Sequence, residues 1–142
     1  MSADALARLK AYWETVTPDR LASLHTVYTP EAYFRDPFNE VRGAGELRRI
    51  FEHMYETLEA PRFAIGETIL EGDRAVLIWD FDFRIKAWKP EVVQRIHGLS
   101  VVRFAADGRV AYHRDYWDAA GELYAKLPLV GPLMRYLARK MA

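Results

Sequence analysis

The sequence predicts a single α+β domain in which helices come first and a curled antiparallel sheet follows. Three observations support this expectation. Apolar residues recur at helical spacing up to about residue 58. From Arg62 onward they alternate with a period of two, as in half-buried strands. The dipeptide Asp107-Gly108, typical of a tight hairpin turn, then separates the last two extended segments.

Three helices are expected in the first half of the chain. Residues 3–16 place an apolar stripe on one helix face, formed by Leu6, Leu9, Trp13 and Val16. Thr17-Pro18 predicts a second helix with Thr17 as N-cap and an inner face of Leu21, Leu24 and Tyr28. After a short extended piece over 32–36, Gly43 precedes a third helix with the stripe Leu47, Ile50, Phe51, Met54, Tyr55 and Leu58.

Four strands are expected afterwards, over 62–71, 74–86, 91–105 and 109–117. With Asp107 and Gly108 as the two turn residues, directly opposed residues share a sheet face. The expected cross-strand pairs are Val102–His113, Ser100–Asp115, Gly98–Trp117 and, at the end of the hairpin, Phe104–Ala111. A loop over 87–90 sets Asp80 opposite His97 and Asp82 opposite Arg95, and these complementary pairs support the register.

This register turns His113 and Asp115 toward the helices, because their sheet face is otherwise apolar. An ionised carboxylate in an apolar interior is costly unless it is paired. Two interpretations stay open: a buried structural pair of His113 with Asp115, or a cavity that holds a tuned acid and base.

Composition excludes several classes of function. The 142 residues carry no formal net charge, which argues against nucleic acid as a partner. The absence of cysteine excludes a disulfide framework and thiolate chemistry. No apolar run resembles a signal peptide or a membrane span, so a cytoplasmic protein is expected. No motif indicates a cofactor, and none specifies a metal site.

Residues 119–142 are expected to form a helical extension of the single domain 1–142. Asp118 is placed to cap a helix that runs through Lys126, and Gly131-Pro132 starts another. The last helix has one apolar side and one basic side. We expect it to dock over a cavity mouth or onto a partner subunit, rather than to bind a membrane surface.

Two stretches resemble a known superfamily. YFRDPFNEVRG before an amphipathic helix, together with strands ending in FAADGRVAYHRDYWD, resembles the nuclear transport factor 2-like proteins. These include ketosteroid isomerases, limonene epoxide hydrolases and SnoaL-like polyketide cyclases. The resemblance runs from about Leu6 to Asp118. It implies a cone-shaped fold, in which a curved antiparallel sheet wraps on N-terminal helices around a central cavity. It also implies a homodimer that forms through the outer, charged face of the sheet.

The resemblance also implies roles for single residues. The ketosteroid isomerases imply that Asp36, in Asp-Pro-Phe, is a general base and that Tyr12 is an oxyanion donor. The epoxide hydrolases and cyclases imply proton transfer by Asp115 beside His113. Neither set is complete, because Ser100 stands where both the isomerase and the epoxide hydrolase carry an aspartate.

The expected function is therefore cofactor-free acid–base chemistry in a hydrophobic pocket. The substrate would be of steroid, terpenoid or polyketide type, and the reaction an isomerisation, a cyclisation or a hydration or hydrolysis. The catalytic candidates are Asp36, Asp115, His113 and Tyr12. The candidate ligand contacts are Phe34, Phe38, Trp79, Phe81, Phe83, Ser100, Val102 and Trp117. The alternative is a non-catalytic ligand-binding or dimerising module, and the sequence leaves open whether the protein is an enzyme.

Overall fold

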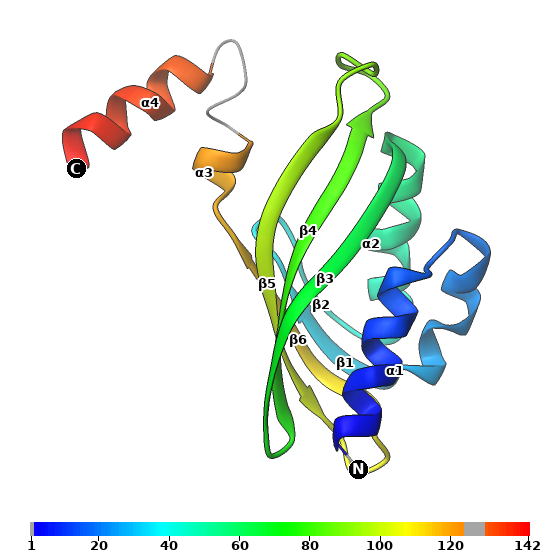
Figure 1. Cartoon of the computed structure of the whole chain (residues 1–142). Helices are drawn as coiled ribbons and strands as arrows, with labels where there is room; N and C mark the ends of the chain where they lie inside the picture. Colours follow the sequence, from blue (N-terminus) through cyan, green and yellow to red (C-terminus); the bar gives the residue numbers. More distant parts are fainter. Residues whose placement is uncertain (1, 124–129) are drawn as a thin grey trace.

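The computed structural model describes residues 2–123 and 130–142. A curved sheet of six strands carries the N-terminal helices on one face (Figure 1). The elements in chain order are α1 (Ser2–Glu14), the 3₁₀ helix η1 (Asp19–Thr26), β1 (Tyr28–Arg35), β2 (Glu40–Arg42), α2 (Ala44–Thr57), β3 (Leu58–Glu71), β4 (Arg74–Ile85), β5 (Gln94–Phe104), β6 (Val110–Trp117), α3 (Ala119–Glu122) and α4 (Val130–Met141). The predicted α+β class and the cone-shaped architecture are confirmed.

The strands lie in the order β2-β1-β6-β5-β4-β3, and the sheet does not close. All neighbours are antiparallel except β1 and β6, which run parallel. The sequence did not predict this pair, because the two strands are far apart in the chain. The pairing sets Phe34 beside His113, so the segment that precedes Asp36 lies next to the strand that carries Asp115.

The predicted register is confirmed where the site lies. Ser100 pairs with Asp115, Val102 with His113 and Gly98 with Trp117. The pairs Asp80–His97 and Asp82–Arg95 are also present. One pair was wrong: a bulge after Arg103 sets Phe104 opposite Val110 rather than Ala111. The extra residue is Ala111 on β6, close to the Asp107-Gly108 turn, so the pairs farther from the turn keep their predicted partners and faces.

Several predicted boundaries were wrong. Tyr28 begins β1 instead of ending a helix, and Leu58 begins β3 instead of ending α2. In both places an apolar residue continues the apolar stripe of the preceding helix, and the spacing of apolar residues alone does not show where that helix ends. The short strand β2 was missed. The loop before β5 extends to Val93, and it contains Lys89 at a left-handed φ of 46°.

The core fills the space between the helices and the sheet. Buried members come from α1, η1, β1, α2, the first part of β4, the last part of β5 and the start of β6, and they include Leu9, Leu21, Leu24, Tyr28, Phe34, Leu47, Val102 and Val110. Farther along the sheet, Trp79, Phe83 and Ile96 form a second buried cluster. The core therefore closes one end of the cone, while the second cluster lines the space toward the other end.

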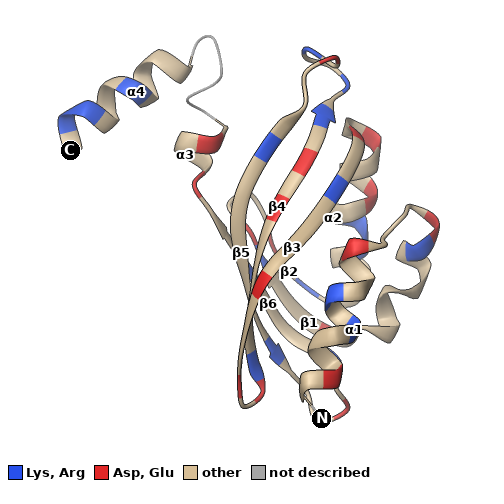
Figure 2. Cartoon of the chain, in the orientation of Figure 1, with Lys and Arg blue, Asp and Glu red and all other residues tan. Residues whose placement is uncertain are grey.

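Ion pairs connect neighbouring strands on the charged face of the sheet. Arg95 donates to Asp82 at 2.7 and 2.8 Å, and His97 lies 2.8 Å from Asp80. Figure 2 shows the acidic positions of β4 between basic positions of its neighbours. These groups are at least partly exposed, so each pair contributes little to the free energy of unfolding.

The C-terminal helices lie on the opposite side from α1 (Figure 1). Asp118 caps α3 as predicted, accepting from the Gly121 N–H at 2.9 Å, but the helix ends at Glu122. The predicted continuation to Lys126 lies partly outside the described residues. Helix α4 exposes its apolar side chains and carries basic but no acidic residues (Figure 2). None of the described helices is long and apolar enough to cross a membrane.

Candidate acid–base site

A cavity of about 670 Å³ lies between α2 and the inner face of the sheet. This is the size of a pocket for a drug-sized molecule. Its walls are mainly apolar and aromatic: Ile50, Phe51, Met54, Leu58, Phe63, Trp79, Phe81, Phe83, Ile85, Ile96 and Trp117. The predicted ligand contacts Phe38, Trp79, Phe81, Phe83 and Trp117 all line it. Asp36 and Asp115 supply carboxylates to the same cavity.

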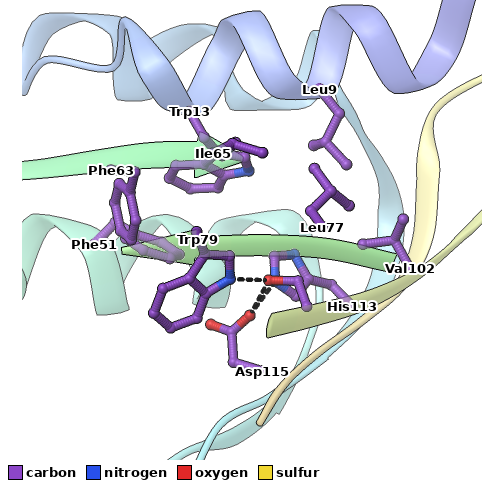
Figure 3. A pocket seen from close by; sticks show the side chains of 11 residues that line it. Leu9, Trp13, Phe51, Phe63, Ile65, Leu77, Trp79, Val102, His113 and Asp115 are labelled. Atoms are coloured by element: carbon purple, nitrogen blue, oxygen red, sulfur yellow. Dashed lines mark hydrogen bonds and ion pairs between the residues drawn. The ribbon is translucent and has the colours of Figure 1, made fainter. Parts of the chain in front are cut away.

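A second, much smaller cavity of about 30 Å³ lies deeper in the cone, with room for a water molecule (Figure 3). It is lined by Leu9, Trp13, Phe51, Phe63, Ile65, Leu77, Trp79, Ser100, Val102, His113 and Asp115. Trp79 and Asp115 border both cavities, together with Phe51 and Phe63. The Asp115 carboxylate thus lies at the junction of the wide pocket and the small cavity.

Asp115 is held by two donors from the neighbouring residues of its own sheet face. The Ser100 hydroxyl donates to Asp115 Oδ1 at 2.5 Å, and His113 Nε2 lies 2.6 Å from the same oxygen. The Trp79 indole N–H donates to Ser100 Oγ at 2.9 Å (Figure 3). No hydrogen bond from the described residues reaches the second oxygen, Oδ2. One carboxylate oxygen is therefore fixed, and the other is free for a bound molecule.

His113 is almost completely buried and is held on its other side by Tyr28. The Tyr28 hydroxyl lies 2.7 Å from His113 Nδ1 and accepts from the Trp13 indole N–H at 2.9 Å. Burial raises the pKa of the Tyr28 hydroxyl well above its ordinary value, so this group keeps its proton. The network that begins at Trp13 therefore ends on the same Asp115 oxygen as the one that begins at Trp79.

Gly98 makes room for the Trp79 ring. A Cβ atom at this position would lie 2.7 Å from Trp79 Cη2 and 2.9 Å from Trp117 Cβ. Real Cβ atoms do not approach so closely, so any larger residue would displace the Trp79 indole or shift β6 at Tyr116 and Trp117. The room that Gly98 leaves opposite Trp117 is filled by protein rather than left for a ligand.

The Asp36 carboxylate is placed differently. Its oxygens accept four hydrogen bonds, from the backbone N–H groups of Phe38 and Asn39 and twice from the Asn39 side-chain amide. This is an Asx-type turn between β1 and β2. Of the two phenylalanines that flank Asp36, Phe38 is 53% exposed and Phe34 packs into the core. Asp36 lines the pocket chiefly as a turn residue.

Four other predicted site residues lie apart from the wide pocket. Tyr12 is buried in the helical core, and its hydroxyl hydrogen is donated to the Arg20 carbonyl at 2.9 Å. Phe34 lines neither cavity and packs edge-on against His113. Val102 borders only the small cavity. Ser100 also faces that cavity, and its single hydrogen is used on Asp115.

Sequence reasoning missed the contribution of α2 and β3 to the pocket. Ile50, Met54 and Phe63 were assigned to apolar stripes without a role at the site. The apolar face of α2 is wider than a helix needs for contact with the core alone, and this width could have indicated that part of it lines a pocket. No group of three or more potential metal-ligating His, Asp or Glu side chains occurs among residues 2–123 and 130–142.

Comparison with known proteins shows the family to which the chain belongs. The family model described as "SnoaL-like domain" matches residues 9–113, which is most of the chain. The chain belongs to the SnoaL-like domain family. No curated protein matches the sequence. Solved structures with low sequence identity to this chain show the same fold, and they include proteins described by different activities.

An NTF2-like protein from Burkholderia thailandensis is 15% identical, with a TM-score of 0.71 over 99% of this chain and 97% of that one. A putative SnoaL-like polyketide cyclase from Jannaschia sp. is 14% identical, with a TM-score of 0.70 over 84% and 87%. An LEH-like epoxide hydrolase from M. tuberculosis is 14% identical, with a TM-score of 0.68 over 96% of each chain. At these identities the likeness establishes the SnoaL-like fold and leaves the chemistry to the site.

Proposed function

We propose that the protein catalyses a cofactor-free proton transfer on a hydrophobic small molecule of polyketide, terpenoid or steroid type. The observation that carries the proposal is the asymmetry of Asp115. One oxygen is fixed by Ser100 and His113, the other has no hydrogen-bond partner among the described residues, and the residue lines an aromatic pocket. A carboxylate held in this way can take a proton from a bound molecule, or from a water attacking it, and return it later in the reaction.

The pocket supports this chemistry in two further ways. Its volume and aromatic walls suit a flat apolar molecule of several rings, which would exclude water from Asp115 on binding. Structural relatives include proteins whose titles name a polyketide cyclase and an epoxide hydrolase, and each of these reactions requires proton transfer. Asp36 is the weaker candidate for the base, because its carboxylate is already engaged in its own turn.

The test compares two single substitutions, Asp115→Asn and Asp36→Asn, with the wild type. Both keep the shape of the side chain and remove its charge. The panel contains an unconjugated steroid enone, whose isomerisation is followed in the ultraviolet, and a cyclic terpene epoxide, whose hydrolysis is followed by chromatography. We expect Asp115→Asn to lower kcat by about 10²–10⁴-fold. Asp36→Asn should lower it less than about threefold.

Ligand affinity is the control for an intact pocket. Trp79 and Trp117 line the cavity, so quenching of tryptophan fluorescence by the same compounds reports binding directly. The affinity should change by less than about twofold in both variants. Turnover that survives in Asp115→Asn would contradict the proposal. Binding without turnover of any compound by the wild type would favour the alternative of a non-catalytic ligand-binding module.

A further inference from the structure

The hydrogen-bond network around Asp115 begins at both ends with a tryptophan. An indole N–H can donate a hydrogen bond but cannot accept one. Trp13 donates to Tyr28, and Trp79 donates to Ser100. The direction of the first bond in each arm is therefore fixed by chemistry alone. Each following group must pass its own hydrogen onward, because an unused buried hydroxyl hydrogen is costly.

The short arm shows the principle. Ser100 Oγ accepts from Trp79, so its only hydrogen goes to Asp115 Oδ1, the other polar atom within hydrogen-bond distance. The long arm follows the same rule. Tyr28 Oη accepts from Trp13, and its hydrogen then goes to His113 Nδ1. A nitrogen that accepts carries no hydrogen, so the ring proton of His113 lies on Nε2 and is donated to Asp115 Oδ1.

We propose that the two tryptophans fix the direction of the whole network, so that His113 is held neutral with its hydrogen on Nε2 and Asp115 exchanges protons through Oδ2 alone. Trp13 and Tyr28 are positioning residues that act through His113. The opposite arrangement, an imidazolium at position 113, would turn Nδ1–H toward Tyr28. Among the described residues the Tyr28 hydroxyl has two hydrogen-bond partners, Trp13 and His113, and if both donated to it the hydroxyl hydrogen would have no acceptor.

The surroundings of His113 contain one charged group. Side chains facing it come from α1 (Trp13), β1 (Tyr28 and Phe34), α2 (Phe51), β5 (Ser100) and β6 (Asp115). Only Asp115 among them is charged, and its Oδ1 already receives two donors. A proton that arrives at Asp115 must therefore bind Oδ2, which receives no hydrogen bond from the described residues. This assigns His113 the part of a fixed donor and removes it as the acid of the reaction.

The first measurement is nuclear magnetic resonance of the full chain labelled with ¹⁵N-histidine at pH 7. Long-range couplings between ring hydrogens and nitrogens distinguish the two neutral tautomers and the imidazolium. The chain has four histidines, and a His113→Gln sample identifies the resonances of interest. We expect an acceptor-type Nδ1 and a hydrogen-bearing Nε2. An Nδ1–H tautomer or a doubly protonated ring would overturn the proposal, whether or not the protein proves to be an enzyme.

The second measurement uses Tyr28→Phe, with Tyr55→Phe as the matched control. The Tyr55 hydroxyl is also buried but has no hydrogen-bond partner, so its removal breaks no bond. Tyr28→Phe should shift the His113 Nδ1 resonance and lower kcat about tenfold at unchanged KM, the value of one lost hydrogen bond. Tyr55→Phe should leave both as in the wild type. An unshifted Nδ1 resonance in Tyr28→Phe would overturn the positioning role. The nitrogen spectrum needs no substrate, so its failure is distinct from a failure of the proposed function.

Discussion

Asp36 and Asp115 border the same cavity, but the structure treats the two carboxylates in opposite ways. Asp36 is held by residues two and three positions along the chain, and hydrogen bonds occupy both of its oxygens. Asp115 is held by His113 on its own strand and by Ser100 on the neighbouring strand, through a single oxygen. The first arrangement stabilises a turn. The second leaves an oxygen available for chemistry.

The difference teaches that a carboxylate in a pocket is a candidate base only if an oxygen remains unoccupied. Asp-Pro-Phe is the more recognisable motif in the sequence, yet its geometry is that of a local Asx turn. Asp115 lies in no such recognisable motif, and the position of its carboxylate depends on the sheet register, on Gly98 and on the two tryptophans Trp13 and Trp79. Substitutions that disturb the surroundings of each carboxylate separately test whether this contrast is correct.

The largest effect on stability is expected from Gly98→Ala, because this substitution disturbs the side chains that hold Asp115. The new methyl group would displace Trp79 or Trp117 and break the bond from Trp79 to Ser100. We expect the free energy of unfolding to fall by about 2–4 kcal/mol, as for an overpacked core with one lost hydrogen bond. Urea unfolding measures the change.

Gly66→Ala is the matched control, because it also adds a methyl group to a strand glycine. The added Cβ atom would lie 3.7 Å from the nearest atom, which is ordinary contact. Its unfolding free energy should stay within about 1 kcal/mol of the wild type. An equal loss in both variants would show that Gly98 is not special.

An intermediate effect is expected from Asp36→Ala. The substitution removes the acceptor of four local hydrogen bonds, so the free energy of unfolding should fall by about 1–2 kcal/mol. Asp36→Asn keeps an acceptor oxygen and should lose less than half as much. Thermal and urea unfolding of the pair check the prediction. A loss of turnover without a loss of stability would reverse the roles that we assign to the two carboxylates.

The smallest effect concerns alkaline pH and the long arm of the network. Burial raises the pKa of the Tyr28 hydroxyl well above its value of 10.0 in the unfolded chain. Above pH 10 the unfolded state releases this proton while the folded state keeps it. The free energy of unfolding therefore falls as pH rises, by at most about 1.4 kcal/mol per pH unit for one group. Below pH 10 both states hold the proton, and the contribution is constant.

Urea unfolding between pH 9 and 11 measures this slope. Tyr28→Phe should flatten it, whereas Tyr116→Phe, which removes an exposed hydroxyl, should keep the wild-type slope. Equal slopes in the wild type and in Tyr28→Phe would show that the Tyr28 hydroxyl is not held in its protonated form.

Much of the fold followed from the sequence because its signals are local. The alternation through β4, β5 and β6 and the Asp107-Gly108 turn were enough to set Ser100 beside Asp115. The parallel pairing of β1 with β6 was not accessible, because no local pattern joins segments so far apart. Its consequence, the contact of Tyr28 with His113, was missed for the same reason.

The site was predicted in part. Asp115, His113 and the aromatic wall were found because alternation shows which residues share a face. The engagement of Asp36 and Tyr12 was not, because a family motif indicates position and not the hydrogen bonds already made there. The direction of the hydrogen bonds that lead to Asp115 could not be predicted either, because it depends on which indole N–H contacts which hydroxyl.

The contact between Tyr28 and His113 spans 85 positions of the chain. A nascent polypeptide cannot complete it until the last strand has left the ribosome. Contacts of such separation are closed late and slow the folding of small domains. The backbone hydrogen bonds of α1 and α2 are local, but the proposed base acquires its orientation only when β1 pairs with β6. If the proposed function is correct, activity should therefore return in the final phase of refolding, after most of the helical signal.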